Sequence, residues 1–140
     1  MSQIRLNNHI IAKGQPPFII SEVGINHNGD VNNALKMIDV AKAAGVNAVK
    51  FQTFRANEFV LDSRQMYTYK SHGTEITESM LEMFKRYELS KEDWVKIKNK
   101  CDEENILFLS TPQNKTDLDL LLELGITAIK VGSDDFTNLP

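Results

Sequence analysis

A short apolar run that ends in polar residues recurs four times in this sequence, and no other feature constrains the fold as much. The runs are Phe18–Ile20 with Glu22 at its end, Ala48–Thr53, Ile106–Thr111 and Thr127–Ser133. Each has the length and the β-branched or aromatic content of a buried strand. Parallel α/β proteins carry their chemistry where such strands end. The repetition therefore predicts an α/β chain with one functional edge.

Helices are predicted between these runs. Asp30 is placed to cap a helix whose apolar residues recur with helical spacing. A capping-box pattern at Ser90–Asp93 opens another helix, and a leucine-rich helix over 115–124 follows the third run. The long segment 54–88 supplies a further helix over 79–86, because connections of that length are functional or carry an element of their own.

The predicted order of elements is β-α-β-α-α-β-α-β, which favours parallel strands joined by right-handed crossovers. A β-hairpin formed by Ile4–Leu6 and His9–Ala12 precedes it. A complete (β/α)8 TIM barrel needs about 250 residues. The 140 residues are therefore predicted to form one domain, the first half of such a barrel, with the hairpin at one end.

Composition and charge exclude several classes of function. A formal net charge of -3 and a pI near 5.6 give no basic surface for nucleic acid. No apolar stretch reaches membrane-spanning length, and the first eight residues lack the apolar core of a signal peptide, so no membrane partner is expected. The single cysteine, Cys101, excludes an internal disulfide and fits a reducing cytoplasm. Its place on the inner side of a predicted helix indicates a buried core residue rather than a nucleophile.

Two lysines in apolar runs are the main candidates for binding. Lys50 and Gln52 share one face of their strand, and Glu22 and Lys130 can take the same inward face of theirs. Burying an ammonium without a partner costs several kcal/mol, so each lysine needs an anion, and Glu22 could neutralise one of them. With Thr111 and Ser133 these residues would suit a phosphate or carboxylate ligand. The alternative is a purely structural layer of paired charges.

His27 and the adjacent Asp134 and Asp135 raise the question of a metal. His9 and His72 show no ligand spacing to His27, which favours a hydrogen-bonded loop histidine. The two aspartates could bind a divalent cation or cap a helix. The residues by themselves therefore identify no metal ligand.

Four motifs resemble, in order and spacing, those of the N-acetylneuraminate (sialic acid) synthase family. They are Ser21–Gly29 (SEVGINHNG), Val49–Thr53 (VKFQT), Phe108–Pro112 (FLSTP) and Ile129–Ser133 (IKVGS), the last followed by Thr137-Asn138. The resemblance covers essentially the whole chain. It implies a (β/α)8 barrel, usually followed by a small antifreeze-like domain; the second half of the barrel and that domain are expected to be absent here.

The resemblance also implies an activity. Such enzymes condense phosphoenolpyruvate with N-acetylmannosamine or a related N-acylated amino sugar, giving a sialic-acid-type nonulosonic acid and phosphate. By motif, the phosphate and carboxylate of phosphoenolpyruvate would be held by Lys50, Gln52, Thr111, Lys130 and Ser133. Glu22 would lie beside the reacting aldehyde carbon, and Asp135 is the second candidate catalytic residue. The resemblance further implies a divalent metal, Mn2+ or Mg2+, and for the full-length protein we expect a homodimer.

Two departures from the family pattern matter. The family commonly has Gly-Ser-Gly-Glu where this sequence has Gly132-Ser-Asp-Asp135, which puts the role of Asp135 and the choice of sugar in question. The metal-binding histidines of the family lie in the second half of the barrel, so no residue here is expected to hold the metal and the isolated chain is expected to be inactive. Two rivals stay open: an aldolase that forms a Schiff base at Lys50 or Lys130, and a non-catalytic phosphate-binding module or inactive fragment.

Overall fold

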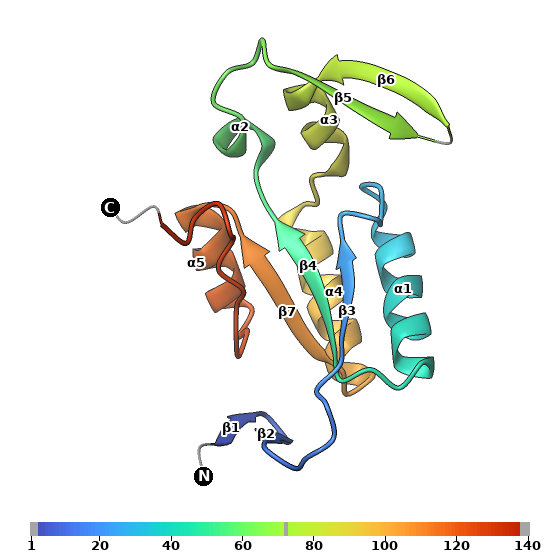
Figure 1. Cartoon of the computed structure of the whole chain (residues 1–140), viewed down its shortest axis with the longest axis vertical. Coiled ribbons are helices and arrows are strands. Elements are labelled where there is room, and N and C mark those ends of the chain that lie inside the picture. Colours follow the sequence, from blue (N-terminus) through green and yellow to red (C-terminus); the bar gives the residue numbers. More distant parts are fainter. Residues whose placement is uncertain (1–2, 72, 138–140) are drawn as a thin grey trace.

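The structure of the chain, a computed structural model, describes residues 3–71 and 73–137. The helices and strands, which Figure 1 shows in chain order, are β1 (Gln3–Leu6), β2 (His9–Ala12), β3 (Ile20–Gly24), α1 (Val31–Ala43), β4 (Ala48–Thr53), α2 (Ala56–Phe59), β5 (Met66–Ser71), β6 (Thr74–Ser79), α3 (Met80–Tyr87), α4 (Lys91–Glu103), β7 (Leu107–Pro112) and α5 (Lys115–Glu123). In the described part of the chain, no helix is long and apolar enough to cross a membrane.

A parallel sheet with the strand order β3-β4-β7 forms the centre of the molecule. Helix α1 connects β3 to β4, and α4 precedes β7, so helices join both parallel pairs. In the register, Glu22 lies opposite Lys50, and Gln52 lies opposite Thr111. The α/β architecture predicted from the sequence is confirmed.

One face of the sheet is covered by helices. Val49 and Phe51 of β4 and Phe108 of β7 are buried there against Ile38 of α1 and Trp94 of α4. The rings of Phe51 and Phe108 have centroids 5.9 Å apart. Burying one such side chain contributes about 1.5–3 kcal/mol, so this layer holds the crossover helices against the strands.

The opposite face is covered by the β1–β2 hairpin where the strands begin. Leu6 and Phe18 pack there on Ala48, Leu107 and Leu109. In Figure 1 the hairpin lies at the end of the molecule away from the tips of the strand arrows. The predicted hairpin is therefore confirmed, and it lies far from the edge at which the candidate residues were expected.

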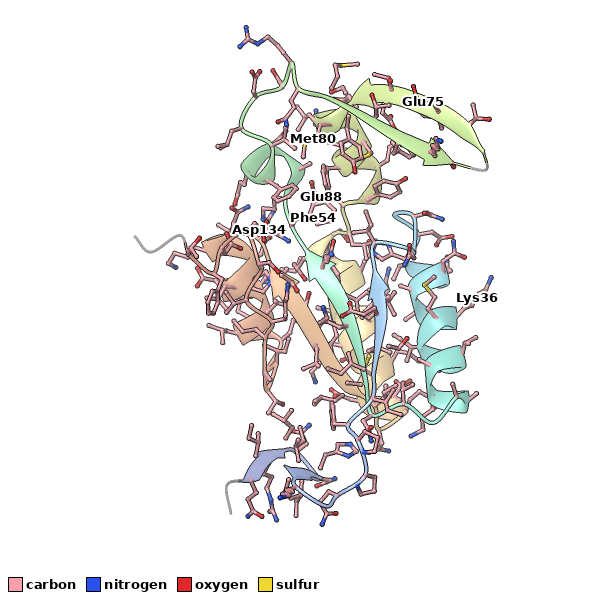
Figure 2. All side chains as sticks on the ribbon, viewed as in Figure 1. Lys36, Phe54, Glu75, Met80, Glu88 and Asp134 are labelled. Carbon is pink, nitrogen blue, oxygen red and sulfur yellow. The ribbon has the colours of Figure 1, made fainter. Side chains whose placement is uncertain are left out.

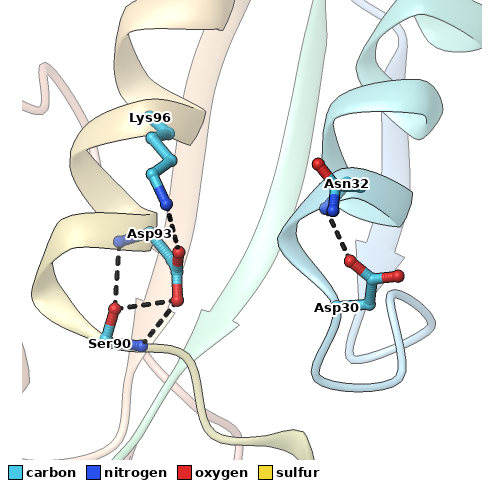
Figure 3. A network of polar contacts seen from close by, with 5 residues as sticks. All are labelled: Asp30, Asn32, Ser90, Asp93 and Lys96. Carbon is cyan, nitrogen blue, oxygen red and sulfur yellow. Dashed lines mark hydrogen bonds and ion pairs between the residues drawn. The ribbon is translucent and has the colours of Figure 1, made fainter.

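Side-chain caps fix where α1 and α4 begin, as Figure 3 shows. Asp30 accepts a hydrogen bond from the backbone N–H of Asn32 at 2.8 Å. Ser90 Oγ accepts from the backbone N–H of Asp93 at 3.2 Å, and the Asp93 carboxylate accepts in return from the backbone N–H of Ser90 at 3.4 Å. Both predicted helix starts are confirmed, including the capping box.

The first central strand begins later than the sequence indicates. β3 starts at Ile20 rather than Phe18, so Glu22 lies within the strand and not at its end. The two prolines before Phe18 have no N–H to donate, and the N–H of Ile19 bonds to the side chain of Asn47 at 2.7 Å. Regular pairing with β4 therefore starts only at Ile20.

The segment 54–88 contains a hairpin that the sequence does not predict. Strands β5 and β6 pair antiparallel, and the chain then enters α3, whose predicted position is confirmed. Most residues of both strands are exposed, so the sequence lacks the apolar alternation of a half-buried strand. In Figure 1 this hairpin and α3 stand beyond the tips of the central strands.

The fourth predicted strand, over 127–131, is reduced to a single bridge. Ile129 pairs with Ser110 of β7, and the N–H of Lys130 donates to the Ser110 carbonyl at 3.0 Å. Among the described residues no strand pairs with the outer edge of this segment. The segment still holds Lys130 beside the tip of β7.

Candidate active site

A cavity of about 370 Å³ lies at the tips of β4 and β7. Five of the seven predicted site residues line it: Lys50, Gln52, Thr111, Lys130 and Ser133. They come from two strands and from the segment that follows the bridge at Ile129. The structure thus brings together all the residues that the motifs assign to the phosphate and carboxylate of a ligand.

The alternation of side chains along β4 explains this grouping. Lys50 and Gln52 point to one face, while Phe51 and Thr53 between and after them are buried on the helix-covered face. On that buried face the hydroxyls of Thr53 and Ser110 share a hydrogen bond of 2.7 Å, which ties the tips of β4 and β7 together. The polar side chains of the open face therefore lie at an edge where a side-chain hydrogen bond joins β4 to β7.

Lys50 is paired with Glu22. Its Nζ lies 2.7 Å from Glu22 Oε1, and the two residues are neighbours in the register of β3 and β4. The side chain of Lys50 is 13% exposed, whereas that of Glu22 is 65% exposed. An ion pair with one solvated partner contributes about 1 kcal/mol or less, so it positions Lys50 more than it stabilises the fold. Glu22 itself lies outside the cavity, on the side of β3 and α1.

Lys130 differs from Lys50 in its surroundings. Its side chain is exposed, and it forms no ion pair within 4.0 Å with the residues of 3–71 and 73–137. Its backbone is fixed by the hydrogen bond to Ser110. The cavity therefore has one lysine that is already neutralised and one whose charge is available to a ligand.

The two aspartates after the last motif take different positions. Asp134 lines the cavity and Asp135 does not; Figure 2 shows Asp134 with Phe54 near the tip of β4. Both carboxylates crowd Gly132, where an added Cβ would lie 2.5 Å from Asp134 Oδ1 and 2.9 Å from Asp135 Oδ2. The sequence favoured Asp135, and the structure adds Asp134 as a candidate. Asn138 of the same motif lies outside the described residues.

An aromatic wall of the cavity was not predicted. Phe54, Phe59 and Phe84 line it, with ring centroids 4.7 to 6.1 Å apart. Phe59 and Phe84 belong to α2 and α3, in the long segment that carries no recognisable motif. The spacing of these rings along the sequence gives no sign that they meet, because their contact depends on how the segment folds back.

His27 and Cys101 are structural residues, as predicted. His27 is 1% exposed, its Nδ1 accepts the N–H of Gly29 at 3.1 Å, and burial lowers the pKa of its imidazole. Gly29 is required there, since a Cβ would lie 1.9 Å from the carbonyl oxygen of Arg86. Cys101 is fully buried in the core, and burial raises the pKa of its thiol to about 12. A thiol in this state does not act as a nucleophile at neutral pH.

A family model described as the NeuB family matches residues 37–140. The chain belongs to the NeuB family. It is 40% identical over 125 residues to an N,N'-diacetyllegionaminic acid synthase of Campylobacter jejuni, a match that covers 87% of this chain and 36% of that protein. It is 32% identical over 140 residues to an uncharacterized protein of Methanocaldococcus jannaschii, of which it covers 37%.

A solved structure agrees with the fold. The N-acetylneuraminic acid synthetase of Leptospira borgpetersenii matches with a TM-score of 0.82 and 34% identity over 98% of this chain and 43% of its own. This NeuB chain thus has the fold of the first half of a (β/α)8 barrel, as predicted. It spans little more than a third of the length of the curated relatives named above.

Proposed function

We propose that this NeuB chain supplies the phosphoenolpyruvate-binding half of a cytoplasmic nonulosonic acid synthase. The observation that carries the proposal is the cavity in which Lys50 and Lys130 meet Gln52, Thr111 and Ser133. Relatives named as synthases of N,N'-diacetyllegionaminic acid, N-acetylneuraminate-9-phosphate and pseudaminic acid support the reaction class. The second substrate would be N-acetylmannosamine or a related N-acylated amino sugar, and the full-length protein would act as a homodimer.

The charges in the cavity suit the first substrate. Phosphoenolpyruvate carries a phosphate and a carboxylate, and charge-assisted hydrogen bonds to such groups are among the strongest that proteins make. Lys130 would bind one anion directly. Lys50, held by Glu22, would bind the other, while the hydroxyls of Thr111 and Ser133 donate further hydrogen bonds.

In the proposed reaction, the methylene carbon of phosphoenolpyruvate bonds to the aldehyde carbon of the open-chain sugar. Water adds to C2, and the bond between C2 and the phosphate oxygen then breaks, leaving a 2-keto acid and free phosphate. The lysines stabilise negative charge and hold the reactants close together in the orientation that the reaction needs. Glu22, which is exposed and pairs with Lys50, would orient the aldehyde or transfer a proton at the aldehyde oxygen. Asp135 or Asp134 would be the second acid.

The divalent metal of the family does not fit the residues described here. Within 3–71 and 73–137, no three His, Cys, Asp or Glu side chains are placed to hold a metal ion. Asp134 and Asp135 are adjacent but have no third partner of that kind. The proposal therefore assigns no step of this chain to a metal, and any metal of the complete synthase would be held elsewhere.

Binding rather than turnover tests the proposal, because turnover requires the rest of the barrel. Calorimetry should detect phosphoenolpyruvate binding to the chain, and Lys50→Ala and Lys130→Ala should each weaken it by about 1.5–3 kcal/mol, the value of a hydrogen bond to a charged group. Lys115→Ala, at an exposed lysine on α5, is the matched control and should change nothing. Unchanged affinity in both active-site variants would refute the assignment.

The same preparation distinguishes the Schiff-base alternative. Borohydride with a 2-keto acid traps an aldolase lysine as a secondary amine, which mass spectrometry locates. We expect no adduct at Lys50 or Lys130, because both lysines serve as cations in the proposed reaction. A stoichiometric adduct at either residue would contradict the synthase proposal and indicate an aldolase.

A further inference from the structure

A second cavity, of about 350 Å³, lies next to the candidate active site. It is enclosed by the tip of β4, the beginning of α4 and the beginning of α5, with Phe54, Trp94 and Asp117 in its wall. Phe54 also lines the first cavity, so the two cavities share a residue of their walls. The residues that the proposed synthase reaction uses do not line this second cavity.

Asp117 lines the second cavity, and one oxygen of its buried carboxylate has no partner. It is the third residue of α5, it is 1% exposed, and its Oδ2 has no hydrogen-bond partner among the described residues. Burial raises the pKa of this carboxyl to about 6, although hydrogen bonds from the backbone N–H groups of Asn114 and Gln113 act to lower it. At neutral pH the group is therefore largely ionised, and leaving one oxygen of a buried carboxylate without a donor is unfavourable.

The charges around Asp117 leave an excess of negative charge. From the α2 region, Glu58 raises the pKa of Asp117 and Arg55 lowers it. Arg55 also lines the cavity, is exposed, and forms no ion pair within 4.0 Å in the described part of the chain. From the α4 side, the cavity is lined by Glu88, Glu92 and Lys91, the last of which is engaged by Glu123 at 2.5 Å. The acids around Asp117, which are Glu58, Glu88 and Glu92, therefore outnumber the bases Arg55 and Lys91, and a cation is favoured over an anion.

Trp94 supplies the second part of the site. Trp94 is 2% exposed and lines the same cavity as Asp117, and its ring packs edge-to-face on Phe51 with centroids 5.9 Å apart. Cations are attracted to the faces of aromatic rings, and to tryptophan most strongly. A guanidinium fork prefers both oxygens of a carboxylate, whereas an ammonium can use a single oxygen. One free oxygen beside an indole therefore suits an ammonium.

We propose that the second cavity binds a primary ammonium group, which donates a hydrogen bond to Asp117 Oδ2 and rests beside the indole of Trp94. The ligand class is a small organic amine. This site is independent of the phosphoenolpyruvate cavity, so either proposal can fail without the other.

The fluorescence of Trp94, the only tryptophan in the chain, reports on the site directly. Methylammonium chloride, titrated at pH 8 against sodium chloride of equal ionic strength, should give a saturable change in emission. At pH 5 the affinity should fall about tenfold, because a carboxyl with a pKa of about 6 is then about nine-tenths protonated. Tetramethylammonium, which has no N–H to donate, should give no saturable change.

Two matched variants locate the response. Asp117→Asn keeps the shape of the side chain and removes its charge, and should abolish the saturable change. Asp119→Asn, at an exposed residue of the same helix that pairs with Lys115, should leave it intact. The proposal is overturned if methylammonium gives no saturable change in the wild-type chain, or if the change persists in folded Asp117→Asn. If Asp117→Asn does not fold, the wild-type chain alone decides: equal affinity for methylammonium at pH 8 and pH 5 overturns the proposal.

Discussion

Asp117 makes the stability of the folded chain depend on pH in the opposite sense to carboxyls that are held in ion pairs. Its pKa is raised from 3.8 to about 6, so the folded state holds this proton more tightly than the unfolded state does. Between these two values the unfolded chain binds fewer protons at this group, and stability falls as pH rises. Paired acids such as Glu78 behave in the opposite way: Arg86 and Tyr69 lower its pKa from 4.5 to about 2, so its contribution to stability rises with pH between these two values.

Asp117→Asn isolates this contribution. The free energy of unfolding of the variant minus that of the wild type should increase from pH 4 to pH 7, by up to about 3 kcal/mol for a shift of this size, and should then level off. Denaturant unfolding at several pH values, in the absence of organic amines, measures the difference. Asp119→Asn gives the baseline, and a flat difference would show that the Asp117 carboxyl has an ordinary pKa in the folded chain.

Some site residues can be predicted from the sequence and others cannot. Lys50 and Gln52 could be placed on one face because the alternation of a strand fixes it, and Thr111 follows from the motif after the third run. Phe59 and Phe84 could not be placed, because their contact at 4.7 Å depends on the path of the segment between β4 and α4. Alternation in a strand is local, whereas contacts across a folded-back segment are not.

At the scale of elements, local signals located the helices well. The start of α4 depends on the capping box, so Ser90→Ala should destabilise the chain by about 1 kcal/mol, within the range of 0.5–2 for such caps. For a chain of this size the melting temperature should fall by about 3 °C. Ser63→Ala, at an exposed residue between α2 and β5, is the control with the same chemical change. Equal melting temperatures for both variants would mean that the box is not formed in solution.

Strand boundaries were predicted less well than helix starts, for physical reasons that differ between segments. β3 begins later than predicted because the N–H of Ile19 bonds to the Asn47 side chain before the ladder begins. The hairpin of β5 and β6 is exposed on both faces, so burial leaves no pattern in its sequence. The segment 127–131 has the composition of a strand, but within the described residues it pairs with β7 only through the bridge between Ile129 and Ser110. Pairing partners, which composition does not reveal, decide all three cases.

At the scale of the whole molecule, the sheet has an edge that nothing in the described chain covers. β3 pairs with β4 on one side only, and beside it lies a mostly apolar groove of about 530 Å³ between β3 and α1. Ile19 and Ile20 are 49% and 40% exposed at this edge, and Val40 on α1 is 69% exposed. An uncovered edge strand beside apolar surface promotes association.

We therefore expect the 140-residue chain to self-associate. Size-exclusion chromatography with light scattering should give a mass above the 15.9 kDa of one chain, and rising with concentration. Val40→Lys places a charge in the groove and should shift the population toward the monomer. Leu61→Lys is the matched control, because Leu61 is 97% exposed in the loop after α2, away from this edge. A monomeric wild-type chain at all concentrations would show that the β3 edge is protected in solution. If both variants reduced the mass equally, net charge rather than the groove would govern association.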